Sequence, residues 1–181
     1  AFLFVFSVMS STILYSQTTV YINPAAGSDS NDGSIGAPFR TIERGLTIIG
    51  SGGIVYLRGG IYSRGISALT LNRNGTSGNR IRIWAYGNEV PVLDYTGQTH
   101  YYSGIDIGGS YYHLRGIVAQ YSGYSGIWIH GSHNIIERCV TRFNQHAGLK
   151  IIALAGEVPG DNLVWNCDSH SNYYSGHVGD C

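Results

Sequence analysis

The sequence predicts an all-β protein: a right-handed, single-stranded parallel β-helix with a short capping helix at its N-terminal end. The first observation is a repeated pattern, Gly104-Ile105-Asp106-Ile107, Gly126-Ile127-Trp128-Ile129 and Gly148-Leu149-Lys150-Ile151, whose starts are 22 residues apart. A fourth repeat begins at Gly176, after an insertion around residues 154–160. The second observation is that later positions match in the same phase: Leu114, Ile136 and Val164; Ile117, Cys139 and Cys167; Ser122, Asn144 and Asn172.

The length of the repeat selects the architecture. Twenty-two residues are too few for a helix pair and too many for a hexapeptide coil, but they fit one coil of about three short strands. Such coils stack at the ordinary strand spacing of about 4.8 Å. The 26 glycines and the low charged content of 12% suit a chain with many bends and few solvated helices. Chance recurrence in a glycine-rich all-β chain is the alternative, and it requires three columns to coincide.

The repeat also predicts where side chains lie. Because neighbouring residues of a strand point to opposite sides, Ile127 and Ile129 should face inward, and Trp128 and His130 outward. We expect the first glycine of each repeat to adopt a positive φ after a tight bend. Stacked asparagines at a bend, such as Asn144 and Asn172, should hydrogen-bond from coil to coil.

Residues 1–16 read as the remnant of a secretory signal peptide. The run Ala1–Phe6 is apolar and is followed by serine-rich sequence, without a starting Met or a basic region. The stretch is too short for a comfortable membrane span, and a buried first strand is the alternative. We therefore expect export, and a mature domain at 17–181 that forms the N-terminal part of a β-helix.

A strand at Thr18–Ile22 and a short helix at Thr41–Ile49 are expected next. The helix is indicated by apolar residues at helical spacing, by Thr41 as a cap and by Gly50 as a stop. It would cover the open apolar end of the first coil and its unpaired strand edges. The intervening Asp29–Gly33 resembles a cation-binding loop, but it lacks the bidentate Glu, so ordinary turn chemistry is expected.

Further strands follow from short apolar or alternating runs bounded by turn residues. They are expected within Gly53–Tyr62 and at Leu69–Leu71, Arg80–Ala85 and Val90–Asp94.

Charge and cysteine content exclude several classes of function. With 181 residues and a net charge of 0, the chain suits one domain and presents no electrostatic case for nucleic acid or a membrane surface. Cys139 and Cys167 share an inward column, which favours stacked core thiols over a bridge, because a disulfide needs specific geometry. The seven histidines show no zinc-ligand spacing on one strand.

Several segments resemble a known group. The runs Tyr21–Pro24, Asp32–Ser34, Ala37–Ile42 and Val55–Tyr62 look like the N-terminal cap and first coil of secreted right-handed parallel β-helix proteins. The run Asn166-Cys167-Asp168-Ser169-His170-Ser171-Asn172-Tyr173 looks like the segment that leads into the active site of family 9 polysaccharide lyases, the pectate lyases. The resemblance extends from Thr19 to the end of the sequence.

The resemblance implies calcium as cofactor, an acidic, pectate-like polysaccharide as substrate, and extracellular location. In that family a calcium site built largely from aspartates works with a lysine base, and Asp168 falls where the first calcium ligand would be. The remaining aspartates and the lysine belong to a region expected after Gly176–Asp180. Lys150 does not match the lysine position, so the catalytic base is unassigned. We therefore expect a C-terminally truncated chain without catalytic activity of its own.

The column register predicts a polar surface around Asp168. If Cys167 points inward, Asp168 and His170 point outward, beside Arg138 and Arg142 of the preceding coil. Arg138, Arg142 and His170 would then bind the acidic sugar chain, with the arginines forking onto carboxylates. A surface ion pair between Asp168 and one of the arginines, worth about 0–1 kcal/mol, is the alternative.

A second outward column contains Asp106, Trp128 and Lys150. A cation–π contact between Lys150 and Trp128 is the expected structural role, and a sugar-stacking platform is the alternative. The tyrosines that gather at coil bends likewise either cover the bends or face carbohydrate.

Together these patterns favour a secreted lyase that cleaves pectate or polygalacturonate by calcium-assisted β-elimination, monomeric at full length. Such a reaction needs a cation to neutralise the uronate charge and a base within reach of the adjacent proton. A non-catalytic carbohydrate-binding or cell-surface β-helix is the alternative, because the fold hosts many functions. A hydrolase would need paired carboxylates on one face, which the sequence does not show.

Overall fold

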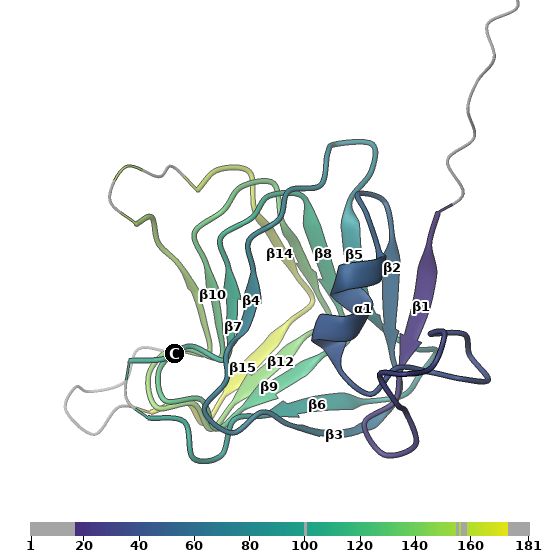
Figure 1. Cartoon of the computed structure of the whole chain (residues 1–181). Coiled ribbons are helices and arrows are strands. Elements are labelled where there is room, and N and C mark those ends of the chain that lie inside the picture. The colour runs from purple at the N-terminus through teal and green to yellow at the C-terminus, as the bar shows by residue number, and fades with distance from the viewer. Residues whose placement is uncertain (1–16, 100, 155, 157–158, 174–181) are drawn as a thin grey trace, which may run out of the picture.

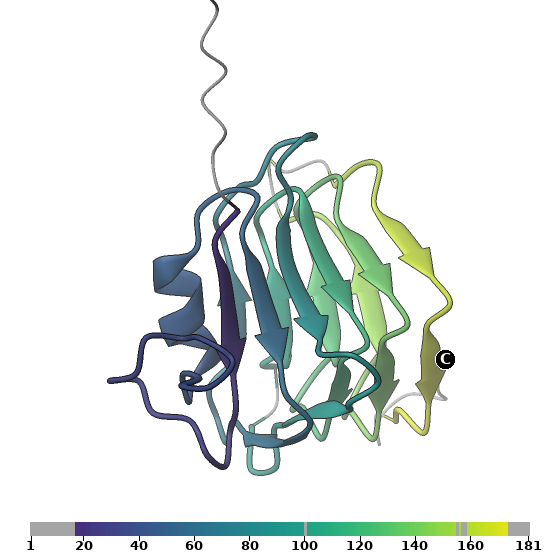
Figure 2. The same cartoon turned by 90° about the vertical axis from the view of Figure 1, so that its right-hand side faces the viewer.

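The computed structural model describes residues 17–99, 101–154, 156 and 159–173, and these form a stack of parallel β-coils (Figures 1 and 2). Helix α1 (Ile42–Ile48) lies at one end of the stack and strand β14 (Leu163–Trp165) at the other (Figure 2). The signal-peptide remnant expected at residues 1–16 and the repeat beginning at Gly176 lie outside the described residues. No helix in the described part of the chain is both long and apolar enough to cross a membrane.

Successive coils contribute strands in turn to three parallel sheets, called sheets A, B and C here. Sheet A contains, in spatial order, β1 (Thr19–Ile22), β2 (Ile54–Leu57), β5 (Ile81–Ala85), β8 (Tyr112–Arg115), β11 (Ile135–Glu137) and β14 (Leu163–Trp165). Sheet B contains β3 (Gly60–Ser63), β6 (Pro91–Asp94), β9 (Val118–Gln120), β12 (Val140–Arg142) and β15 (Asp168–His170). Sheet C contains β4 (Leu69–Leu71), β7 (Ile105–Ile107), β10 (Ile127–Ile129) and β13 (Leu149–Ile151).

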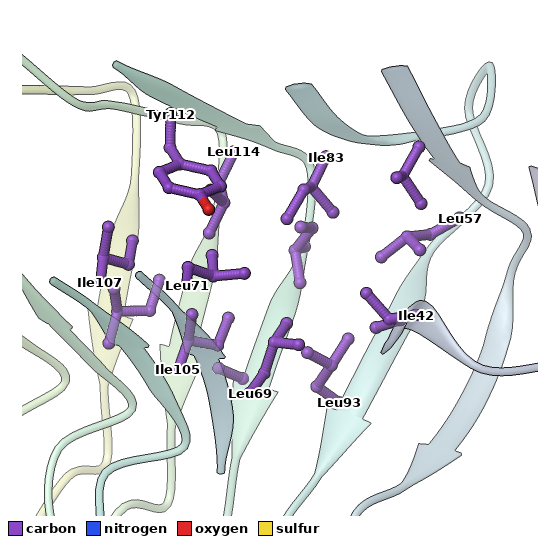
Figure 3. Packing of buried hydrophobic residues seen from close by; sticks show 14 of the residues in the cluster. Ile42, Leu57, Leu69, Leu71, Ile83, Leu93, Ile105, Ile107, Tyr112 and Leu114 are labelled. Atoms are coloured by element: carbon purple, nitrogen blue, oxygen red, sulfur yellow. The ribbon is translucent and has the colours of Figure 1, made fainter. Parts of the chain in front are cut away.

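The 22-residue repeat is confirmed as the coil of the helix. Ile127 pairs in register with Ile105 on one side and with Leu149 on the other. Ile105 and Ile127 are fully buried, and the inward residues of all three sheets form one apolar core (Figure 3). The inward column of each strand therefore stacks on the same column of the next coil, which removes a continuous apolar strip from water.

The predicted reason for glycine at the start of each repeat was wrong. Gly104, Gly126 and Gly148 do not adopt a positive φ. A Cβ on Gly126 would instead lie 2.6 Å from Nδ2 of Asn144 and 2.8 Å from the carbonyl oxygen of Gly148. Glycine is needed there because neighbouring coils approach too closely for any side chain.

Positive φ values occur instead at the coil corners, mostly on residues other than glycine. The corner between sheets A and B carries Gly116, Arg138 and Asn166, with φ of 71°, 51° and 54° in successive coils. The corner between sheets B and C carries Tyr121, Phe143 and Ser171, and the third corner carries Tyr111, His133 and Asp161. Each left-handed corner turns the chain sharply into the next sheet.

Asparagine side chains link the coils, as the sequence predicts. Nδ2 of Asn144 donates to Oδ1 of Asn172 at 2.8 Å, and Oδ1 of Asn144 accepts from the backbone N–H of Ser122 at 3.0 Å. A second ladder, which the sequence analysis missed, involves Asn134 and Asn162: the N–H of Asn134 donates to Oδ1 of Asn162 at 2.9 Å. Both ladders satisfy backbone groups that the bends leave unpaired.

Helix α1 (Ile42–Ile48) caps the first coil as expected, with Ile42 buried against the core. Oγ1 of Thr41 accepts from the N–H of Arg44 at 3.2 Å, which makes Thr41 the N-cap. Oδ1 of Asp29 accepts from the N–H groups of Arg40 and Thr41, both at 2.9 Å. The turn chemistry expected for the loop 29–33 is seen at Asp32, whose Oδ1 accepts from the N–H of Ser34 at 2.8 Å.

Candidate functional site

The outward face of sheet B brings the predicted site residues together. Strand β15 pairs with β12 so that Asp168 lies beside Val140 and His170 beside Arg142. Arg138 occupies the corner that leads into β12. The in-register stacking of the coils thus collects these side chains on one surface, although 32 residues separate Arg138 from His170 in the sequence.

A ladder of polar side chains fixes Arg142 on this face. Nε of Arg142 donates to Oε1 of Gln120 at 2.9 Å, and Nε2 of Gln120 donates to Oδ2 of Asp94 at 2.7 Å. Burial raises the pKa of Asp94, but hydrogen bonds from Thr96 and Gln120 outweigh it and hold the pKa below its ordinary value. The ionised Asp94 orients the amide of Gln120, so that its oxygen faces the arginine.

Sequence reasoning missed Gln120 and Asp94. The signal was present, because both residues occupy the outward column of Arg142 in the two preceding coils. Following that column further toward the N-terminus would have found them.

Arg138 projects into solvent from its left-handed corner. Its side chain is 65% exposed, and Nε lies 3.8 Å from Oε1 of Glu137. The other oxygen of Glu137 is 2.9 Å from Nε2 of His113 on the neighbouring strand. The guanidinium of Arg138 is therefore only loosely paired and can accept an anionic ligand.

Asp168 and His170 are exposed on the last described coil. The ion pair considered between Asp168 and Arg138 or Arg142 is not formed in the described part of the chain. His170 is 3.2 Å through Nδ1 from Oγ of Ser171, and its ring meets that of Phe143 edge-on at 6.0 Å. The Asp168 carboxylate is thus accessible and not neutralised by a neighbouring arginine.

The residues at Asp168 fit calcium only in part. An accessible carboxylate is the hard oxygen ligand that calcium prefers, but calcium takes six to eight such ligands. Within the described residues, no three His, Cys, Asp or Glu side chains gather in a way that could hold a metal ion. Asp168 therefore suits the role of one ligand, and the described residues do not build a calcium site by themselves.

The second outward column is in register as predicted, with Trp128 paired to Asp106 and Lys150. The cation–π contact expected between Lys150 and Trp128 was wrong. Nζ of Lys150 instead lies 4.6 Å from the ring centroid of Tyr124 and 2.7 Å from its hydroxyl oxygen. Lys150 lies on sheet C rather than on the face that carries Asp168.

The bend aromatics pack against each other along the helix axis. Tyr121 stacks on Phe143 with centroids 5.4 Å apart, and Tyr111 stacks on His133 at 4.6 Å. These stacks cover the bends, as the structural role requires. Tyr121 and Phe143 nevertheless stay 42% and 41% exposed, so the sugar-facing role remains a prediction.

Cys139 and Cys167 are stacked free thiols, as predicted from their shared column. The hydrogen bond with Cys167, together with burial, raises the pKa of the Cys139 thiol well above its ordinary value.

Comparison with known proteins places this geometry in a family. The family model described as "Pel9A-like, right handed beta helix region" matches residues 20–180. Pectate lyase L of Paenibacillus polymyxa is 37% identical over 140 residues, which are 72% of this chain and 31% of that protein. Pectate lyase PEL9 of Emericella nidulans is 32% identical over 75 residues, or 41% of this chain and 18% of that protein.

Solved structures agree on the fold. The crystal structure of pectate lyase Pel9A superposes with a TM-score of 0.76 at 26% identity, over 88% of this chain and 41% of that one. A rhamnogalacturonan lyase follows with a TM-score of 0.64 at 21% identity, over 87% of this chain and 42% of that one. The similarity to the rhamnogalacturonan lyase shows only that the two proteins share a fold. This chain spans less than half the length of each of these relatives and structures.

Proposed function

Since this chain belongs to the Pel9A-like family of right-handed parallel β-helix proteins, we propose that it is part of a secreted polysaccharide lyase that cleaves pectate or polygalacturonate. The substrate would bind to the outward side of sheet B. The pairing of β12 with β15, which puts Arg142 beside His170 and next to the column of Asp168, is the structural observation that carries it.

The arginines account for recognition of an acidic chain. Guanidinium groups bind carboxylates in forks of two hydrogen bonds. Arg142 uses Nε for Gln120, and its terminal nitrogens make no hydrogen bond or ion pair within the described residues. Arg138 stands one corner away with an exposed guanidinium. His170, exposed beside Arg142, completes the set proposed to contact the sugar chain.

Asp168 has a different role in this proposal, as one carboxylate ligand of a calcium ion. Calcium, when bound, would neutralise the uronate carboxylate and the negative charge that develops when the adjacent proton is removed. The residues of this chain bind and orient the substrate in the proposal. The base that removes the proton is not assigned to any of them.

Expression of the protein with whatever sequence precedes and follows residues 1–181 in its gene allows a direct test. Formation of unsaturated product from polygalacturonate would be followed with and without a chelator, for the wild type and for Asp168→Asn. We expect product formation that the chelator abolishes and that Asp168→Asn strongly reduces. Asp161→Asn is the matched control, because Asp161 is 80% exposed and lies at a different corner of the coils.

The outcomes separate the two functional hypotheses. Product formation that survives thorough chelation contradicts the calcium role. Binding of polygalacturonate without any unsaturated product contradicts the lyase and supports a non-catalytic carbohydrate-binding β-helix.

A further inference from the structure

A groove of about 430 Å³ lies at the corner between sheets A and B, outside the strands that carry Asp168 and His170. One wall is the loop 87–90, which joins β5 to β6. The groove is also lined by Val118 and Val140 on the outward face of sheet B, and by two guanidinium groups, those of Arg115 and Arg138.

Unequal corner lengths create this groove. The corner between β5 and β6 contains residues 86–90, whereas those between β8 and β9 and between β11 and β12 contain only Gly116–Ile117 and Arg138–Cys139. The longer loop stands above the two short corners that follow it along the stack. The groove therefore extends over the coils of Arg115 and Arg138, and the next coil along the stack carries Asp168.

Arg115 is held in a fixed orientation but has free donors. Its guanidinium carbon lies 4.0 Å from the ring centroid of Trp84, a stacking contact that restrains the planar group. Within the described residues, the side chain of Arg115 makes no hydrogen bond and no ion pair. A half-buried guanidinium with unused N–H groups is suited to a carboxylate that arrives from outside.

Two carboxylates lie near the groove, and both have partners. Both oxygens of Glu89 accept from Nε of Arg58 at 2.9 Å, and one also accepts from the N–H of Gly59 at 2.6 Å. Glu137 is shared between His113 at 2.9 Å and the more distant Arg138 at 3.8 Å. Glu137 is also the register partner of Arg115. Arg58 compensates the charge of Glu89, and Arg115 and Arg138 together carry one positive charge more than Glu137, so the groove attracts anions.

We propose that Arg115 and Arg138 form a carboxylate-binding subsite for a uronate unit of an acidic polysaccharide. The chain would run along the helix axis, from the coil of Asp168 toward the loop 87–90. Val118, Val140 and Asp168 occupy one outward column in successive coils, so that the groove and the proposed calcium ligand lie along one line. Coils follow each other at about 4.8 Å, which sets Arg115 about two coils, or about 10 Å, from the coil of Asp168.

This subsite rests on the proposed function, because it extends the same acidic-chain surface beyond the predicted residues. The subsite differs from the proposed lyase reaction in one testable respect, because binding at the subsite needs no calcium. Equilibrium binding of de-esterified oligogalacturonate to the full-length protein, measured in the presence of a chelator, therefore isolates it from the lyase reaction. Methyl-esterified oligogalacturonate of the same length is the matched ligand without charge.

Arg115→Gln should weaken binding of the de-esterified chain about tenfold and leave binding of the esterified chain unchanged. Arg115→Lys keeps the charge but lacks the planar fork, so it should recover only part of the affinity. Arg82→Gln is the matched control: Arg82 also lies over Trp84, at 5.7 Å, but it donates to the carbonyl oxygen of Gly52 and does not line the groove. Its affinity for both chains should equal that of the wild type.

Three results would overturn the subsite: unchanged affinity of Arg115→Gln, an equal loss for both chains, or no binding of the de-esterified chain by the wild type. Thermal unfolding of Arg115→Gln and Arg115→Lys shows whether each variant is folded. A charge-dependent loss of binding in a protein that yields no unsaturated product would reject the lyase proposal and still support the subsite.

Discussion

Arg142 is held by Gln120: Nε of the arginine donates to Oε1 of the amide at 2.9 Å, on the same face as His170. The interaction fixes the guanidinium from its inner side, and the ionised Asp94 fixes the amide in turn. A buried amide therefore positions the guanidinium of Arg142.

Gln120→Ala should release Arg142 from this position. We expect affinity for polygalacturonate to fall about three- to tenfold, and the free energy of unfolding to fall by about 1 kcal/mol through the lost hydrogen bonds. Binding isotherms and urea unfolding measure the two effects. If the ladder only stabilises the fold, the affinity of the folded variant will equal that of the wild type.

Arg138→Gly should separate stability from binding at the corner. Arg138 has a φ of 51°, a conformation that costs a non-glycine residue roughly 1–2 kcal/mol and glycine little. The variant should be as stable as the wild type or more stable by about 1 kcal/mol, while its affinity for acidic chains falls. Gly65→Ala, at a φ of 53° and with open space around it, is the inverse control and should be less stable. A stable Arg138→Gly variant with full affinity would contradict a binding role for Arg138.

Asn144→Ala should break the ladder between coils. Asn144 is 1% exposed and accepts from Ser122, so that its loss leaves buried groups unsatisfied at about 1–3 kcal/mol each. We expect the midpoint of thermal unfolding to fall by several degrees. Asn79→Ala, an exposed asparagine in a turn, should change it little, and equal effects in the two variants would argue against the ladder.

Gly126→Ala tests the close approach of neighbouring coils. The added methyl would lie 2.6 Å from Nδ2 of Asn144 and 2.8 Å from the carbonyl oxygen of Gly148, so stability should fall by about 1–3 kcal/mol. Gly36→Ala is the control, because nothing lies within 4 Å of its added Cβ and its φ is not positive. If Gly126→Ala leaves the free energy of unfolding unchanged, the neighbouring coils can move apart without loss of stability.

His113 should make stability sensitive to acid. Burial lowers its pKa below the ordinary 6.5, even though the hydrogen bond with Glu137 acts in the opposite direction. Below pH 6.5 the unfolded chain therefore binds a proton that the folded chain excludes, and stability falls as the pH falls. His113→Gln should make this decline shallower in urea unfolding between neutral and acidic pH. An unchanged slope would assign the acid sensitivity to other groups.

The sequence was a good guide wherever a pattern repeats. Ile105, Ile127 and Leu149 share one column because inward positions recur at the coil length of 22 residues. The same pattern, once the insertion around residues 154–160 is allowed for, placed Asn144 over Asn172. Contacts that depend on the reach of long side chains could not be read this way. A cation–π contact of Lys150 was expected with Trp128, its partner on the neighbouring strand. Lys150 instead contacts Tyr124, whose side chain reaches it from the bend before Trp128.

The sequence by itself determined the coil, the inward columns, the capping helix and the grouping of Arg138, Arg142, Asp168 and His170, because register in a stacked helix is a matter of counting residues. Only the tertiary structure decided which residues bend the chain, why the repeat glycines are needed, how Gln120 holds Arg142, and where Arg115 meets Arg138 in a groove. These features depend on distances between coils and on corner lengths, which a linear pattern does not encode.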